Sequence, residues 1–206
     1  MITVFDIETH EIPENEWEKF IPEKIGNITD PVKVREKFKE KLALHAKTAY
    51  IACIGYDDGK RKNIYCNNKP ILGTNFCDSE KDLIYNFYFR VSELTKTNLL
   101  VGHNCYNFDL PFIVQRGLIH GIKPPVGLRN HRYWNDNIKD TMTEWTCDSY
   151  GEYIGLGELA ELFKVGTKDK KGGAKFPELW DYDPERDIEY LRNDLELTYQ
   201  IAEKMF

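Results

Sequence analysis

The sequence lacks any long apolar run: none approaches the roughly 20 consecutive apolar residues that a membrane-spanning helix needs. It also lacks an excess of basic residues, because 28 Lys and Arg stand against 34 Asp and Glu, for a formal net charge of −6. That balance at first argues against a nucleic-acid partner, since most proteins of that class carry a basic face. The composition is not that of a disordered, collagen-like or disulfide-dense chain. We therefore expect a globular protein with no membrane partner.

Cysteine is scarce and carries no recognisable pattern. The five cysteines contain no Cys-x-x-Cys pair, and none stands in a close Cys/His cluster of the kind that binds zinc. Free thiols are typical of a reducing compartment. The sequence thus predicts a cytoplasmic protein without disulfides.

Apolar segments alternate with amphipathic ones along the 206 residues, and 41% of the residues are hydrophobic, which is ample for one core. We expect a single domain over residues 1–206. Strands are predicted at residues 2–5, 49–56, 62–66, 99–101 and 138–141, and helices at 79–94, 109–117, 157–163 and from 184 onward. Residues 10–47 form a polar insertion between the first two strands, and its second half, Val32 to Lys47, is expected to be a basic helix. Strands interspersed with helices are typical of an α/β fold with a mixed sheet.

Carboxylates stand at the ends or edges of these apolar elements, where they are costly unless something neutralises them. Asp6 and Glu8 are two residues apart on the first strand, so both side chains point to one face. Asp109 follows the strand at 99–101 by a short polar turn. Tyr190 and Asp194 are four residues apart on the last helix and project from one side of it. A divalent cation would convert the mutual repulsion of these acids into binding.

Each of these features alone has an ordinary explanation. An Asp-x-Glu pair occurs on many exposed strands, Asp109 can cap the helix that follows it, and Tyr190 with Asp194 can be a common helix pair. The ordered set is more specific than its parts.

Three segments in that order resemble the exonuclease motifs of the DEDD superfamily: Phe5 to Thr9 (FDIET), Gly102 to Asp109 (GHNCYNFD) and Tyr190 to Asp194 (YLRND). The tyrosine four residues before the last aspartate resembles the DEDDy subgroup, and the chain is similar to a stand-alone proofreading domain of the family B polymerase type. The resemblance implies a ribonuclease H-like α/β fold, with a mixed five-stranded sheet flanked by helices. The insertion at 10–47 departs from the family pattern.

The activity that the resemblance implies is 3′-to-5′ hydrolysis of single-stranded DNA ends, with RNA as the second choice, releasing nucleoside 5′-monophosphates. Two divalent cations, Mg²⁺ or Mn²⁺, are implied as cofactors, and four carboxylates are the hard oxygen ligands that such ions prefer. By motif position Asp6 bridges both metals, Glu8 and Asp194 complete the water-activating site, and Asp109 holds the second metal. Tyr190 is implied to orient the attacking water.

Substrate contacts follow from the same motifs. The resemblance places Asn104 and Phe108 beside the terminal nucleotide and the backbone of Thr9 near the terminal 3′-hydroxyl. For two neighbours, His103 and Asp140, we expect structural roles, as a buried histidine and as a turn or helix cap. The lysine-rich segments 33–47 and 164–175 each carry a net charge of +4 and are candidates for binding phosphates.

Two other functions remain open at this point. One is an RNase D-like or oligoribonucleotide-degrading RNA exonuclease, and the other is a nucleic-acid-binding module that has the fold without the activity. The net acidity does not decide against a nucleic-acid partner after all, because residues 178–196 alone hold eight acids against two arginines. Protein partners leave no readable pattern.

Overall fold

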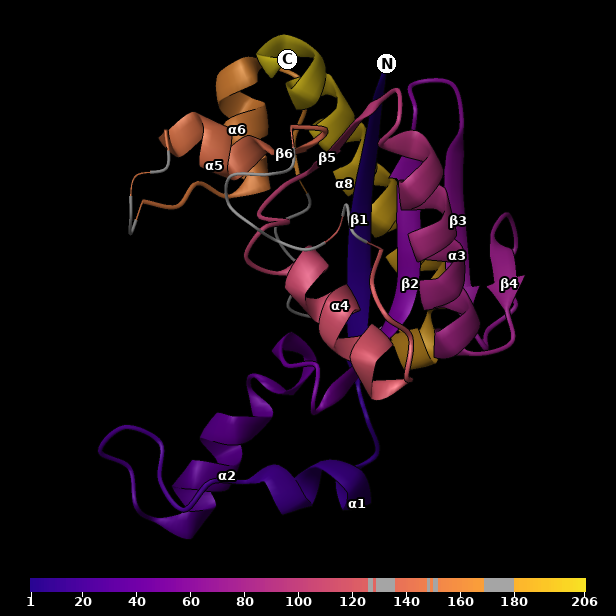
Figure 1. The fold of residues 1–206 in the computed structure, drawn as a ribbon. Coiled ribbons are helices and arrows are strands. Elements are labelled where there is room, and N and C mark those ends of the chain that lie inside the picture. Colours follow the sequence, from indigo (N-terminus) through magenta and orange to yellow (C-terminus); the bar gives the residue numbers. More distant parts are fainter. Residues whose placement is uncertain (126–127, 129–135, 148, 150–151, 169–179) are drawn as a thin grey trace.

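A central sheet organises the computed structural model, which describes residues 1–125, 128, 136–147, 149, 152–168 and 180–206 (Figure 1). The strands are β1 (Ile2–Glu11), β2 (Ala49–Asp57), β3 (Lys62–Asn67), β4 (Asn75–Cys77), β5 (Leu99–Gly102) and β6 (Ile138–Asp140). Their order across the sheet is β4-β3-β2-β1-β5-β6. The predicted mixed sheet is confirmed, but the predicted number of strands was one too low. The missing strand is the short β4, which pairs parallel to β3 at one edge.

The pairing of β1 creates an open edge in the middle of the sheet. β1 runs antiparallel to β2 along most of its length, from Val4 to Glu11. On its other side it pairs parallel to β5 only from Ile2 to Val4. On this side the remainder of β1 has no strand partner among the described residues.

Helices cover both faces of the sheet (Figure 1). The helical elements are α1 (Glu14–Trp17), η1 (Glu18–Phe20), α2 (Pro31–Lys39), η2 (Leu42–Leu44), α3 (Glu80–Leu94), α4 (Asp109–Ile119), α5 (Thr141–Thr146), α6 (Leu156–Phe163) and α8 (Pro184–Met205). α3 and α4 pack on one face, where Phe5, Ile7 and Phe87 belong to the larger core cluster. α8 packs on the other face, where Val4 and Leu191 belong to a second core cluster. The predicted α/β fold with flanking helices is thus confirmed.

Capping residues set the starts of the long helices as the sequence predicts. The Ser79 hydroxyl accepts the backbone N–H of Asp82 at the start of α3. Asp183 accepts the N–H of Arg186, and Pro184 occupies the first position of α8. In the described part of the chain no helix is both long and apolar enough to cross a bilayer.

The insertion at residues 10–47 projects from the end of β1, away from the rest of the sheet (Figure 1). Trp17, Phe38 and Leu42 form a small core of its own. The single basic helix predicted for 32–47 is wrong, because α2 ends at Lys39 and a separate turn, η2, follows. The chain has to reverse there to enter β2, and the buried Thr48 hydroxyl fixes the reversal by donating to the Leu42 carbonyl at 2.7 Å.

Candidate active site

β1 positions the first two acids of the site. Val4 faces the α8 side of the sheet, so the alternation of a strand directs Asp6 and Glu8 to that same side. Phe5 and Ile7 point the other way into the core beneath α3 and α4. The apolar residues of β1 therefore anchor the strand and leave its two carboxylates beside α8.

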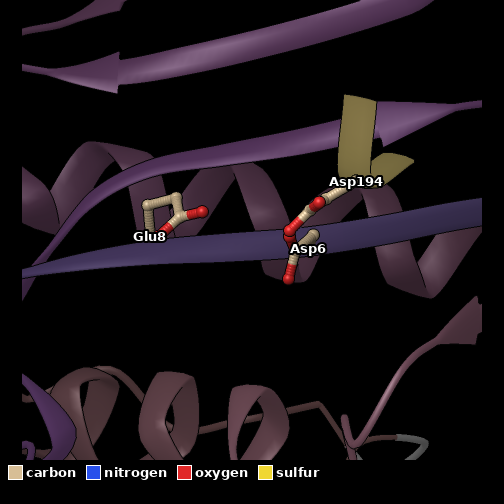
Figure 2. Close-up of side chains that lie close together, drawn as sticks. All are labelled: Asp6, Glu8 and Asp194. Carbon is tan, nitrogen blue, oxygen red and sulfur yellow. The ribbon is translucent and has the colours of Figure 1, made fainter. Parts of the chain in front are cut away.

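α8 supplies the third acid, Asp194, from its buried face. One carboxylate oxygen from each of Asp6, Glu8 and Asp194 lies within 4.8 Å of the other two. Figure 2 shows Asp194 reaching from α8 toward Asp6, with Glu8 further along β1. Asp6 and Asp194 are 188 residues apart in the sequence, and the packing of α8 on β1 brings them together.

Asp109 approaches from the open edge of β1. Its Oδ1 accepts the backbone N–H of Ile7 at 3.1 Å, so the carboxylate occupies a position that a neighbouring strand would otherwise fill. Asp109 is the first residue of α4 and Phe108 is its N-cap, so the ordinary role of Asp109 as the cap does not apply. After burial, the negative charge of Asp109 is the largest cause of the raised pKa of Asp6. The fourth acid thus lies close to Asp6.

Electrostatics make this cluster costly without a cation. Burial is the main cause that raises the pKa of Asp6 and of Glu8 well above their ordinary values, and the neighbouring carboxylates raise both further. Burial also raises the pKa of Asp109 to about 7. The buried Asp194 Oδ1 has no hydrogen-bond partner among the described residues. A set of oxygen donors with one buried acceptor unsatisfied fits Mg²⁺ or Mn²⁺.

Lys168 is a functional candidate that the motifs did not single out. Its ammonium lies 2.5 Å from Asp194 Oδ2 and 5.0 Å from the centre of the Tyr190 ring. It stands in the predicted lysine-rich segment 164–175, of which residues 169–175 lie outside the described residues. The nearby Asp194 and Tyr190 raise the pKa of Lys168, against the effect of its burial. The side chain therefore places one positive charge inside the acidic cluster.

Tyr190 lies one turn before Asp194 on the same side of α8. The residue is half-buried, and burial followed by the charge of Asp194 raises its pKa far above 10. The phenol therefore stays protonated at neutral pH and can donate or accept a hydrogen bond, but it cannot serve as a base.

The three predicted substrate-binding residues, Asn104, Phe108 and Thr9, each have a different environment. Asn104 adopts a left-handed backbone conformation with φ of +58°, and its Oδ1 accepts from Asn107. Phe108 packs partly buried against Phe112, with ring centres 5.6 Å apart. The buried Thr9 hydroxyl donates to the Ala43 carbonyl of η2 at 2.6 Å. The contacts of all three residues are thus internal to the protein.

His103 and Asp140 have the structural roles expected of them. His103 contacts the Thr141 hydroxyl and the Ile154 carbonyl through its two ring nitrogens, and burial lowers its pKa to about 4. Asp140 caps α5 and also accepts the backbone N–H groups of Asn104 and Tyr106 at 2.9 Å each. Both residues therefore hold the turn that leads to Asp109.

Asp187 is a further acid that the sequence does not single out. It lies two helical turns before Asp194, on the same side of α8. Only 1% of the residue is exposed, and its Oδ2 has no hydrogen-bond partner within the described ranges. Burial raises the pKa of Asp187 to about 7, and the nearby Asp183 raises it further. In the sequence it looks like an ordinary first-turn acid, so no pattern distinguishes it.

Comparison with known proteins relates this architecture to polymerases. DNA polymerase 2 of Aeropyrum pernix is 26% identical over 147 residues, which are 61% of this chain and 17% of that protein. The family B DNA polymerase of the archaeon Pyrobaculum calidifontis matches 98% of this chain and 24% of its own, with a TM-score of 0.62 and 17% identity, which shows a shared fold. This chain thus spans only a small part of the length of either polymerase. Residues 41–202 match a family model, and the chain accordingly belongs to the family described as "Predicted 3'-5' exonuclease related to the exonuclease domain of PolB".

Proposed function

We propose that this chain is a metal-dependent 3′-to-5′ exonuclease that removes nucleoside 5′-monophosphates from single-stranded ends, with DNA preferred over RNA. The observation that carries the proposal is the convergence of Asp6, Glu8 and Asp194 within 4.8 Å, with raised carboxyl pKa values that a bound cation would lower. Family membership supports the direction of hydrolysis.

Asp6, Glu8 and Asp194 would hold one divalent cation, and Asp109 together with Asp6 would hold a second. Two such ions, when bound, supply charge neutralisation at the attacking and the leaving oxygen of a phosphodiester. Asp109 is held for this purpose by the Ile7 N–H, which fixes its carboxylate against β1.

The other residues of the site would bind the substrate and orient the attacking water. The protonated Tyr190 hydroxyl would hydrogen-bond the attacking water and direct it at the phosphorus. Lys168 would release Asp194 when a cation takes its place and would then be available to the scissile phosphate. The turn built by Asp140 and Asn104 would hold the terminal nucleotide beside Phe108, with the 3′-hydroxyl near the Thr9 backbone.

A strand-shortening assay tests the proposal. A 5′-labelled single strand of DNA, and the same sequence as RNA, are incubated with the parent protein in Mg²⁺, in Mn²⁺ and in chelator. We expect a ladder that shortens from the 3′ end, with DNA cleaved faster, and no ladder in chelator or with Asp6→Asn. Asp30→Asn, which changes an exposed helix cap far from the site, is the matched control and should leave the ladder unchanged.

The outcomes separate the alternatives. A faster ladder on RNA would favour the RNA exonuclease, and tight strand binding without cleavage would favour the binding module. Cleavage by Asp6→Asn at the rate of the parent would refute the metal site.

A further inference from the structure

A groove on the outer side of α8 lies apart from the acidic site. It encloses about 500 Å³ between the hairpin tip that joins β2 to β3 and the second half of α8. Lys60 and Arg61 line it from the hairpin, and Tyr199, Gln200 and Lys204 line it from α8. We call this space the α8 groove.

Positive charge is left over in the α8 groove after its internal ion pairs are formed. Lys62 is bound within the groove wall by Glu196 and by Asp57, the latter at 3.2 Å. Lys60, Arg61 and Lys204 are exposed, and none of them forms an ion pair in the described part of the chain. The lining as a whole carries four cations, Lys60, Arg61, Lys62 and Lys204, against three carboxylates, Asp57, Glu196 and Glu203, which leaves one net positive charge. The Glu203 Oε1 accepts the Tyr199 hydroxyl at 3.1 Å. The groove is therefore suited to a small anion.

The backbone of the hairpin tip is fixed in place, which sets where the side chains of Lys60 and Arg61 begin. Asp58 Oδ1 accepts the backbone N–H groups of Lys60 at 2.9 Å and of Arg61 at 2.8 Å. Gly59 adopts a φ of +78°, and a Cβ at this position would lie 2.2 Å from the Tyr199 hydroxyl oxygen. The tip thus rests directly on α8, so its backbone needs little ordering when a ligand binds.

The groove and the acidic site share two elements. α8 carries Asp194 and, from two residues later, the groove residues. Val165 lines the groove, and three residues further along the same segment Lys168 binds Asp194. A ligand in the groove would therefore lie beside the segment that carries the lysine of the acidic site.

We propose that the α8 groove binds the phosphate group of a nucleotide through Lys60, Arg61 and Lys204, with the second amide N–H of Gln200, whose first binds Glu196, as a hydrogen-bond donor. The choice of a nucleotide as the source of the phosphate rests on the proposed exonuclease function. The phosphate belongs either to a strand whose 3′ end occupies the acidic site or to a free nucleoside monophosphate, and the test distinguishes these two sources.

The test uses the full chain with Asp6→Asn, which prevents cleavage. In this background, Lys60→Gln, Arg61→Gln and Lys204→Gln are combined in a groove variant. The matched control combines Lys81→Gln, Lys96→Gln and Lys123→Gln, three exposed lysines outside the groove. Fluorescence anisotropy measures binding of a 5′-labelled 12-nucleotide oligothymidylate over a range of KCl concentrations, and equilibrium dialysis measures binding of radiolabelled thymidine monophosphate.

If the groove binds strand phosphates, the slope of log affinity against log salt falls by up to about 2 in the groove variant, at about 0.7 for each of three lost contacts. Lys204→Gln alone should lower it by about a third of that amount, and the control should not change it. If the groove binds the free nucleotide, the groove variant loses thymidine monophosphate binding while strand binding stays unchanged. The proposal is overturned if the groove variant equals the control in both assays, or if the parent background binds neither ligand.

A separate cleavage assay keeps this result apart from the exonuclease proposal. Absence of a ladder from the protein with Asp6 intact, together with weaker binding by the groove variant, would refute the exonuclease and retain the phosphate site. A normal ladder with equal binding by groove variant and control would refute the phosphate site alone.

Discussion

Replacing Asp187 by Asn should stabilise the protein when no metal is present. The carboxyl of Asp187 is buried, its Oδ2 lacks a hydrogen-bond partner among the described residues, and its pKa is raised to about 7. At a pH above 7 the folded protein therefore holds a carboxylate in a place that disfavours its charge.

The size of the effect follows from the two pKa values of the group. The ordinary value is 3.8, so the folded state holds the proton more tightly by about 3 pH units, and each unit is worth about 1.4 kcal/mol. Because the unfolded chain loses this proton at lower pH, the free energy of unfolding falls as pH rises from about 4 to about 7. The gain in the free energy of unfolding from Asp187→Asn is therefore at most about 4 kcal/mol, and the cost of burying the amide of Asn lowers this gain by about 1–3 kcal/mol.

Urea unfolding in chelator at pH 5 and pH 8 measures this effect. We expect Asp187→Asn to raise the free energy of unfolding by about 2 kcal/mol at pH 8, and the gain to be largely lost at pH 5. Glu185→Gln removes one negative charge from an exposed position in the same first turn of α8 and should lower the stability slightly at both pH values, through the helix dipole. A gain that does not depend on pH, or a destabilisation at pH 8, would refute the reasoning.

Three further expectations concern other parts of the molecule. Glu80→Ala removes the carboxylate that binds the buried Arg116 and should cost about 3–5 kcal/mol in urea unfolding, whereas a loss below about 1 kcal/mol would show that the pair does not hold α3 to α4. Gly59→Ala places a Cβ against the Tyr199 hydroxyl at a left-handed backbone position and should lower the free energy of unfolding by about 1–3 kcal/mol. The double variant with Tyr199→Ala should lose less stability than the two single variants together, and equal losses would show that the clash is absent. Tyr190→Phe should slow cleavage by about 10-fold to 100-fold while Mn²⁺ affinity is kept, and unchanged turnover would contradict its role in orienting water.

Regular patterns in the sequence anticipated much of the acidic site. The two-residue spacing of Asp6 and Glu8 and the four-residue spacing of Tyr190 and Asp194 are local, and each fixes which side of a strand or helix a residue faces. Which side of β1 packs against which side of α8 depends on tertiary packing, which local spacing does not specify. The motif resemblance supplied that information for Asp109, whose contact with the Ile7 N–H spans 102 residues.

The features that the sequence did not reveal have identifiable causes. β4 has only three residues, and its central Phe76 is 49% exposed, so neither length nor an apolar pattern marks it as a strand. The turn that follows α2 is held by Thr48, which lies nine residues beyond Lys39 and donates its hydroxyl to the Leu42 carbonyl. Lys168 is one of several lysines in its segment, and only its contact with Asp194 across 26 residues distinguishes it.

We propose that a divalent cation bound by Asp6, Glu8 and Asp194 is required for cleavage from the 3′ end. The most direct test measures bound Mn²⁺ by electron paramagnetic resonance and strand shortening in the same samples, over a range of Mn²⁺ concentrations. We expect the cleavage rate of the parent to rise with the amount of bound Mn²⁺, and Asp194→Asn to lose binding and cleavage together. Cleavage without bound Mn²⁺, or full cleavage by Asp194→Asn, would contradict the claim.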